Sequence, residues 1–346
     1  MSFTDFCSLI FENFSVMVTV IITLAVAFVN GWTDAPNAIA SSVVTRSVTL
    51  KKAVLLAAAA DFFGAVIVGT FNGNVTETMI NIADFGSDSR IALVSLSAAM
   101  TAVVVWATSA WYFGIPTSES HALIAGLTGA SIAVNGGFGG VDFSQWVKVI
   151  YGLIVSVFIG FILGFAASKI TVKLFQNKDK EKSDVFFIKS QIASSVFMAF
   201  MHGAQDAQKF VGILMLTADA ALQREGDGKI PVWMLMLCSA VIALGTATGG
   251  GRIIKSVGMD MIRLRRDQGF SADMAGAVCL LISTLFGLPV STTHTKTSAM
   301  LGVGVAKSTK AVNWSVAGEM VLAWLLTFPG CGFLGWAMGC IFLKIF

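Results

Sequence analysis

The chain has 346 residues, of which 55% are hydrophobic and only 12% are charged, about half the charged content that is typical of soluble domains. This composition excludes a water-soluble globular protein. The mean hydropathy of +0.80 predicts helices that cross a bilayer, where each segment must pair its own backbone polar groups, and the net charge of +3 is too small to indicate a nucleic-acid partner.

Apolar runs close to the ~20 residues that a spanning helix needs recur along almost the whole chain. They lie at about residues 14–33, 53–72, 91–113, 117–135, 146–168, 191–217, 232–250, 272–287, 295–306 and 314–343. Asp5 and Glu12 precede the first run without any Lys or Arg, so we expect a retained span and not a cleaved signal peptide. The runs predict an all-α polytopic membrane protein.

The first apolar stretch is too long for one straight helix, because residues 14–47 would extend ~50 Å across a hydrocarbon core of ~30 Å. Gly31 and Pro36 mark the expected break, since an interior proline removes a backbone hydrogen bond. A break would expose carbonyl groups beside Asp34 and Asn37, and such oxygens can replace the hydration shell of a cation. The alternative is that Asp34 only caps a kinked helix.

Two motifs each occur twice. Residues 31–38 (GWTDAPNA) resemble residues 203–210 (GAQDAQKF), and residues 114–121 (GIPTSESH) resemble residues 287–294 (GLPVSTTH). The separation from Asp to Pro is 116 − 34 = 82 in the first copy and 289 − 206 = 83 in the second. The matching separations predict an internal duplication, in which Asp206 repeats the role of Asp34.

The distribution of Lys and Arg between the loops predicts the orientation, because cytoplasmic loops are enriched in both. The basic segments are the turn with Arg46, Lys51 and Lys52, the linker at 169–189, and the stretch with Arg252, Lys255, Arg263, Arg265 and Arg266. The N-terminus and residues 73–90 are acidic. We therefore expect a cytoplasmic linker and both termini outside, in a plasma or inner membrane.

With this orientation, the first half crosses the membrane three times, at 14–45, 53–72 and 146–168, and a hairpin at about 91–135 dips in from outside. An odd number of crossings inverts the second half, whose hairpin at about 272–306 then dips from the cytoplasm. The predicted fold is an inverted-topology repeat with two re-entrant helical hairpins and broken helices, as in many secondary transporters. Its parts are residues 1–175, the linker 176–189 and residues 190–346.

At each hairpin tip a cluster of hydroxyl side chains opens the returning helix. These residues are Thr117, Ser118 and Ser120 in the first tip, and Ser291, Thr292 and Thr293 in the second. Hydroxyl and backbone N–H groups at a helix N-terminus bind anions. One such tip could be an ordinary N-cap, but a pair of opposed tips predicts a site for a tetrahedral oxyanion.

Several charged or titratable residues lie in or near the motifs. His121, His202 and His294 are either core residues or groups that titrate during transport. Lys209 stands at the position of Asn37, where an ammonium group could replace a cation or face the anion. Gln205 and Gln208 lie close to Asp206 in the sequence and are candidates to couple transport or to hold the ligand residues in place.

Four further charged residues within the apolar runs leave alternatives open. Lys296 could meet the anion or pair with Asp61 or Glu319, and we expect both of these carboxylates to be structural more than functional. Glu119, within the first tip, would repel an anion unless it is protonated or binds a cation.

Together the four motif copies resemble the inorganic phosphate transporter (PiT) family over essentially the full chain. The resemblance implies import of phosphate by cation symport, with sodium or protons, and phosphate held between the two tips. Carried over by position, Asp34, Asn37 and Asp206 are the implied sodium ligands, and the hydroxyl clusters are the implied phosphate ligands. Thr33 and Gln205 depart from the family pattern, because an Asn usually precedes each Asp.

The departures, with Glu119, keep open a symporter of sulfate or of a metal–phosphate complex, and an anion channel remains a further alternative. No Gly-x-Ser-x-Gly or His-Glu-x-x-His motif is present, so an enzyme is not expected. The expected partners are phosphate, the coupling cation and membrane lipid, without a cofactor, and a homodimer is left open.

Overall fold

The computed structural model describes residues 1–115, 117–224, 228–248, 254 and 261–346. Pro116, Arg252 and Lys255, and the end of the run predicted at 232–250, lie outside this described part. All named elements within it are helical, and seven helices are long and apolar enough to cross a membrane. The prediction of an all-α polytopic membrane protein is confirmed.

The apolar runs that were expected to span the membrane all fall on helices. In chain order these are α1 (Phe3–Glu12), α2 (Phe14–Thr33), α3 (Pro36–Val44), α4 (Leu50–Phe71), α5 (Asn74–Ile80), α6 (Ser89–Phe113), α7 (Glu119–Asn135), α8 (Phe143–Ile154), α9 (Gly160–Phe175), α10 (Lys180–Leu222), α11 (Val232–Thr248), α13 (Arg266–Leu285), α14 (Thr292–Lys307) and α15 (Trp314–Ile345). A π-helical segment, Val155–Ile159, joins α8 to α9.

The first long helix is broken, as expected, between α2 and α3. The break lies at Asp34 and Ala35, just before Pro36, which opens α3 because it has no N–H group to continue the hydrogen-bond ladder. Gly31 has a different role from the one predicted. It lies within α2, and a Cβ atom there would be 2.0 Å from the carbonyl oxygen of Ile242, so it permits close packing against α11.

The corresponding helix of the second half is unbroken, so the prediction of broken helices is wrong for this copy. Helix α10 runs for 43 residues through Asp206. The position of Pro36 is taken by Gln208, which retains its backbone N–H and does not interrupt the ladder. Gly203, like Gly31, is a contact residue, since its Cβ would lie 2.1 Å from the carbonyl oxygen of Asp61 on α4.

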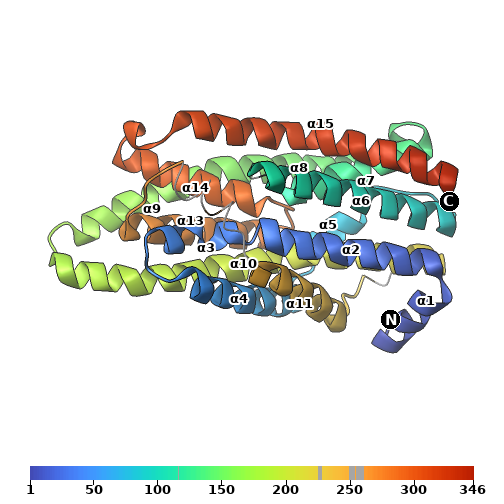
Figure 1. The fold of residues 1–346 in the computed structure, drawn as a ribbon, viewed down its shortest axis with the longest axis horizontal. Coiled ribbons are helices and arrows are strands. Elements are labelled where there is room, and N and C mark those ends of the chain that lie inside the picture. Colours follow the sequence, from blue (N-terminus) through green and yellow to red (C-terminus); the bar gives the residue numbers. More distant parts are fainter. Residues whose placement is uncertain (116, 225–227, 249–253, 255–260) are drawn as a thin grey trace.

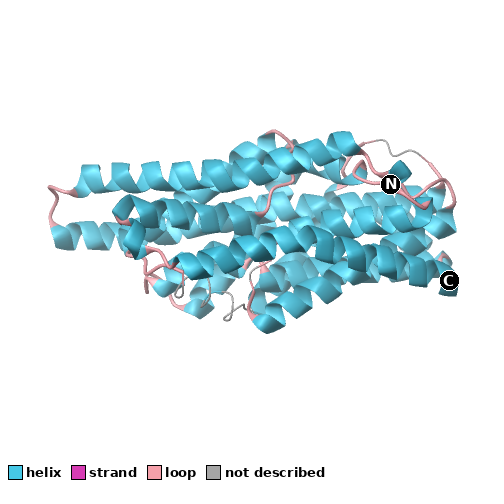
Figure 2. Cartoon of the chain, turned by 90° about the horizontal axis from the view of Figure 1, so that it is seen from above, coloured by secondary structure: helices cyan, strands magenta, loops and turns pink. Residues whose placement is uncertain are grey.

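Two helical hairpins, α6–α7 and α13–α14, enter the bundle from opposite ends. Each outgoing arm ends in a left-handed glycine, Gly114 at φ 71° and Gly287 at φ 65°, a conformation that favours glycine. At the open end of the first hairpin Arg90 contacts the C-terminal residue, Phe346. Both termini lie at this end, and the turn between α9 and α10 lies at the other end (Figures 1 and 2).

Helices of the two halves alternate in the bundle. Helix α2 packs on α11 and α4 packs on α10, while α7 packs on α15 and α9 packs on α14. Each of these pairs joins one helix from residues 1–175 to one from residues 180–346, since α10 already begins within the predicted linker at 176–189, so the two parts of the chain share a single interior. Large apolar side chains such as Phe71, Phe158 and Leu325 are exposed on the outer faces, as expected for a surface that faces lipid.

Candidate functional site

The polar centre of the bundle is built where the α2–α3 break meets the tip of the second hairpin. The Asp34 carboxylate accepts hydrogen bonds from Asn37 Nδ2 at 2.9 Å and from Thr292 Oγ1 at 3.0 Å, and it also accepts one from Thr293. Asn37 donates in addition to Thr293 Oγ1 at 3.0 Å. All four side chains are buried, and the donors to Asp34 are neutral groups.

A second cluster forms where α10 meets the tip of the first hairpin. Lys209 Nζ lies 2.5 Å from Asp206 Oδ1, 2.5 Å from Ser120 Oγ and 3.0 Å from the carbonyl oxygen of Val290. Asp206 also accepts a hydrogen bond from Asn30 Nδ2 at 2.9 Å. Because Lys209 contacts both tips, it joins the two hairpins at the centre of the bundle.

The two tips face each other. The rings of His121 and His294 are 4.6 Å apart between centroids, and both side chains are fully buried. Ser118 and Ser291 are the N-caps of α7 and α14, and their Oγ atoms accept the backbone N–H groups of these histidines at 3.2 Å. The expected hydroxyl clusters are therefore brought together, except that Thr117 is only partly buried.

His202 connects the centre to α4. Its Nδ1 lies 3.0 Å from Asp61 Oδ1 and its Nε2 lies 3.4 Å from Asp206 Oδ2. Thr246 donates to the other oxygen of Asp61 at 3.0 Å. Asp61 is thus hydrogen-bonded to a histidine of the centre.

The remaining candidates occupy different places. Gln205 donates from Nε2 to the carbonyl oxygen of Leu288, 2.8 Å away in the second tip, which makes it a support of that tip. Glu119 is buried at the start of α7. Glu319 is exposed on α15 and does not belong to the site.

Lys296 pairs with Asp273, and not with Asp61 or Glu319 as considered from the sequence. Both groups are fully buried, between the two arms of the second hairpin. Ser41 on α3 completes this cluster, because its hydroxyl lies 2.5 Å from Asp273 Oδ1 and 3.1 Å from Lys296 Nζ. Asp273 lies in a predicted apolar run, so the sequence analysis did not consider it as a partner of Lys296.

Asn30 is a site residue that the sequence motifs missed. It lies four residues before Asp34, on the same face of α2, and at the position that His202 occupies in the second copy. The i, i+4 spacing from an intramembrane aspartate was the available signal.

Several buried oxygen atoms in the centre find no hydrogen-bond donor in the described part of the chain. They are Asn30 Oδ1, Asn37 Oδ1, Gln208 Oε1 and Glu119 Oε2. Carboxylate and amide oxygens are ligands for hard cations, and one oxygen each of Asp34 and Asp206 and a nitrogen of His202 lie within 4.8 Å of one another. The centre thus has the acceptors that a cation requires.

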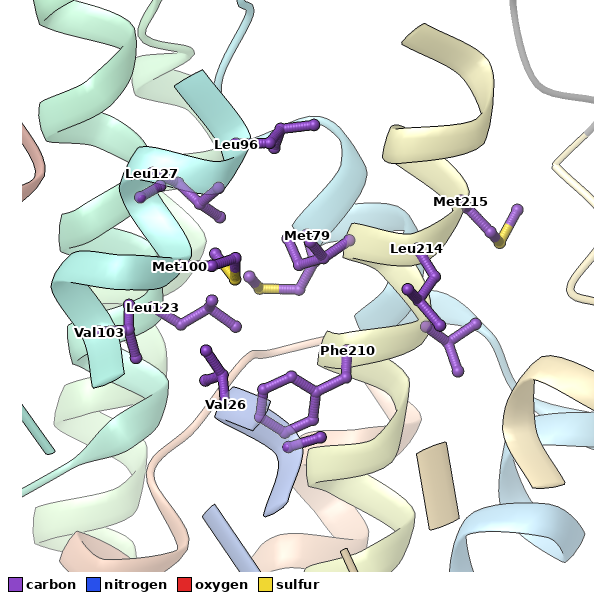
Figure 3. Close-up of a cluster of buried hydrophobic side chains, with 14 of the residues drawn as sticks. Val26, Met79, Leu96, Met100, Val103, Leu123, Leu127, Phe210, Leu214 and Met215 are labelled. Atoms are coloured by element: carbon purple, nitrogen blue, oxygen red, sulfur yellow. The ribbon is translucent and has the colours of Figure 1, made fainter. Parts of the chain in front are cut away.

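A cavity and a buried apolar cluster lie between the polar centre and the end that holds the termini. A cavity of about 1440 Å³ opens at that end and reaches Leu96 and Met215. Leu96 and Met215 belong, together with Met79, Met100 and Leu123, to one buried hydrophobic cluster (Figure 3). The cluster draws side chains from α2, α5, α6, α7 and α10 and lies next to the polar centre, since Leu123 follows the tip residue His121 in α7.

Comparison with known proteins is decisive for the family, because residues 30–335 match the model of the "Phosphate transporter family". The chain belongs to this family. It is 38% identical, over 91% of its own length and 93% of the relative, to a Bacillus subtilis protein described as "Probable low-affinity inorganic phosphate transporter". A Rhizobium meliloti protein of the same description is 37% identical over 89% of this chain and 90% of the relative.

A solved structure titled "The sodium-dependent phosphate transporter" has the same fold, with a TM-score of 0.83 over 96% of this chain and 100% of that chain. Its sequence identity is 22%, so it supports the fold alone. The family resemblance inferred from the repeated motifs is confirmed, and so is the expectation of a transporter and not an enzyme.

Proposed function

We propose that the protein imports inorganic phosphate by symport with a cation, sodium being the first candidate, and that phosphate is held between the tips of α7 and α14. The observation that carries this proposal is the meeting of two helix N-termini, with Lys209 bonded to Ser120 in one tip and to Val290 in the other. Converging backbone N–H and hydroxyl donors at two opposed helix N-termini suit a tetrahedral oxyanion.

The charge of the centre supports coupling to a cation. Asp34, Asp61, Asp206 and Glu119 are four buried carboxyl groups of the centre, and among the described residues only Asp206 is paired with the ammonium group of Lys209. A charge inside a membrane protein is costly unless it is paired, and a phosphate anion would add to the excess of negative charge. A cation bound beside Asp34 compensates the charge of the carboxylates and the charge of the phosphate, so that each ligand improves the binding of the other.

The experiment is uptake of radiolabelled phosphate into proteoliposomes, with sodium and proton gradients imposed separately. We expect saturable uptake that the sodium gradient drives above equilibrium. Uptake that follows only the proton gradient would reject sodium as the coupling ion. Uptake of sulfate that phosphate does not inhibit would reject the phosphate site.

Glycine variants of the N-cap serines separate ligand binding from capping. Glycine at an N-cap costs only a few tenths of a kcal/mol, whereas a hydroxyl donor to a charged oxyanion contributes about 1.5–3 kcal/mol, or ten- to a hundredfold in affinity. Ser118→Gly and Ser291→Gly should therefore each weaken phosphate binding by about that factor. Ser239→Ala, on α11, is the control, and unchanged affinity in both glycine variants would reject the tip site.

We further propose the inverted-repeat topology, with the linker at 176–189 in the cytoplasm and the termini outside. The opposed hairpins and the basic end formed by the turn at 45–49, the linker and the start of α13 support it. In a cysteine-free variant, a cysteine introduced at exposed Lys180 should react only with reagent from the cytoplasmic side, and one at exposed Ser87 only from outside. The reverse pattern would overturn the orientation.

A further inference from the structure

The cluster around Asp34 and the cluster around Asp206 are built from corresponding residues of the two repeats. One corresponding position differs in charge. Adding 172 to Asp34 and Asn37 gives Asp206 and Lys209, and adding 173 to Ser120 gives Thr293. In each cluster an aspartate, the residue three positions later, and a hydroxyl from the opposite half's hairpin tip are within hydrogen-bond distance. The two clusters are therefore copies of one site.

The Asp34 copy has an open acceptor where a cation would be bound. Asn37 Oδ1 is buried and has no donor within the described part of the chain, while Asn37 Nδ2 is used to hold Asp34 and Thr293. Asp34 forms no salt bridge with a described residue. Its negative charge is thus paired only with neutral donors.

The Asp206 copy has an ammonium group at the corresponding position. Lys209 Nζ is held by a carboxylate, a hydroxyl and a carbonyl oxygen at 2.5–3.0 Å, which are the ligand types that hold a hard cation. Lys209 and Asp206 are both buried. A three-residue spacing on α10 places the ammonium group directly beside its carboxylate.

A second pair of corresponding positions, next to the tip hydroxyls, also differs in charge. Glu119 occupies the position of Thr292, which in the other copy donates to Asp34. The second copy therefore carries one more carboxyl group and one more ammonium group than the first.

From this comparison we infer that Lys209 is a tethered cation that permanently fills one of two duplicated cation sites, leaving the Asp34 site as the exchangeable one. The inference rests on the proposed cation symport and deepens it, because it fixes the number of ions that move. A tethered ammonium group moves back with the protein in each transport cycle, so it transfers no charge across the membrane. The protein therefore transports one cation fewer per phosphate than it would with two open cation sites.

The test is the coupling ratio of Lys209→Asn, which recreates the residue of the first copy. In proteoliposomes at zero net flux and clamped voltage, the slope of log phosphate ratio against log sodium ratio gives the number of sodium ions per phosphate. We expect that slope to rise by about one from the natural protein to the variant. A tenfold sodium gradient would then support a phosphate ratio that is larger by a further factor of about ten. Lys209→Met, which offers no amide oxygen, should not show this rise.

An equal slope in the natural protein and in a folded, active Lys209→Asn variant would overturn the inference. So would a loss of phosphate affinity in both variants without any change in sodium dependence, because Lys209 would then be a phosphate ligand. If Lys209→Asn does not fold, Asn37→Lys provides the converse test, since an ammonium group at the first site should abolish sodium stimulation. Failure of the proposed symport would appear separately, as absent sodium-driven uptake in the natural protein.

Discussion

The Asp34→Asn variant should lose nearly all cation-driven phosphate uptake while remaining folded. The substitution keeps the size of the side chain but removes the negative charge of Asp34 from the proposed cation site. It also places an amide N–H₂ group against Thr292 and Thr293, which both donate to the carboxylate. Loss of charge-assisted bonds of about 1.5–3 kcal/mol each predicts a fall of at least about tenfold to a hundredfold in uptake at low sodium.

The matched control for this variant is Asp88→Asn. Asp88 is exposed and caps α6 by accepting the N–H group of Ile91 at 3.0 Å, and asparagine is an equally good N-cap. Its uptake should equal that of the natural protein. Sodium-stimulated uptake that survives in Asp34→Asn at the natural level would show that the cation binds elsewhere.

The sequence was sufficient for the helices, the break at Asp34 and the form of each hairpin tip, because each depends on local chemistry. Apolar length determines a span, proline ends a helix, and a left-handed glycine followed by serine forms a hairpin tip. Helix α10 stays unbroken because Gln208 stands where the first copy has Pro36, so the proline that interrupts the first long helix has no counterpart in the second.

Pairings across the bundle could not be predicted, since they depend on which helices pack together. From the sequence, Lys296 could pair with more than one carboxylate. The packing of α13 on α14 brings it to Asp273. The contact of Asn30 with Asp206 joins residues 176 positions apart. Side-chain chemistry predicted which buried polar groups need a hydrogen-bond or ion-pair partner, and helix packing determines which residue that partner is.

The buried pair of Asp273 and Lys296 has no counterpart in the first hairpin. Subtracting 173 gives Met100 and Leu123, which lie together in the apolar cluster (Figure 3). Removing one member of a buried pair strands the other charge and costs about 3–5 kcal/mol. Asp273→Met and Lys296→Leu, made singly, should each lower the free energy of unfolding by about that amount, measured by unfolding in detergent.

The double variant with both substitutions should recover the stability that each single variant loses. It copies a pairing that already packs within this fold at the matching positions, and replacing a buried ion pair by apolar groups of similar size is neutral or stabilising by about 1–4 kcal/mol. Ser41 bonds to both charged groups and would lose them, so Ser41→Ile, which copies Ile213, should improve the double variant further. A double variant less stable than either single variant would mean that the pair contributes net stability of its own. The polar cluster would then be retained because it stabilises the folded protein.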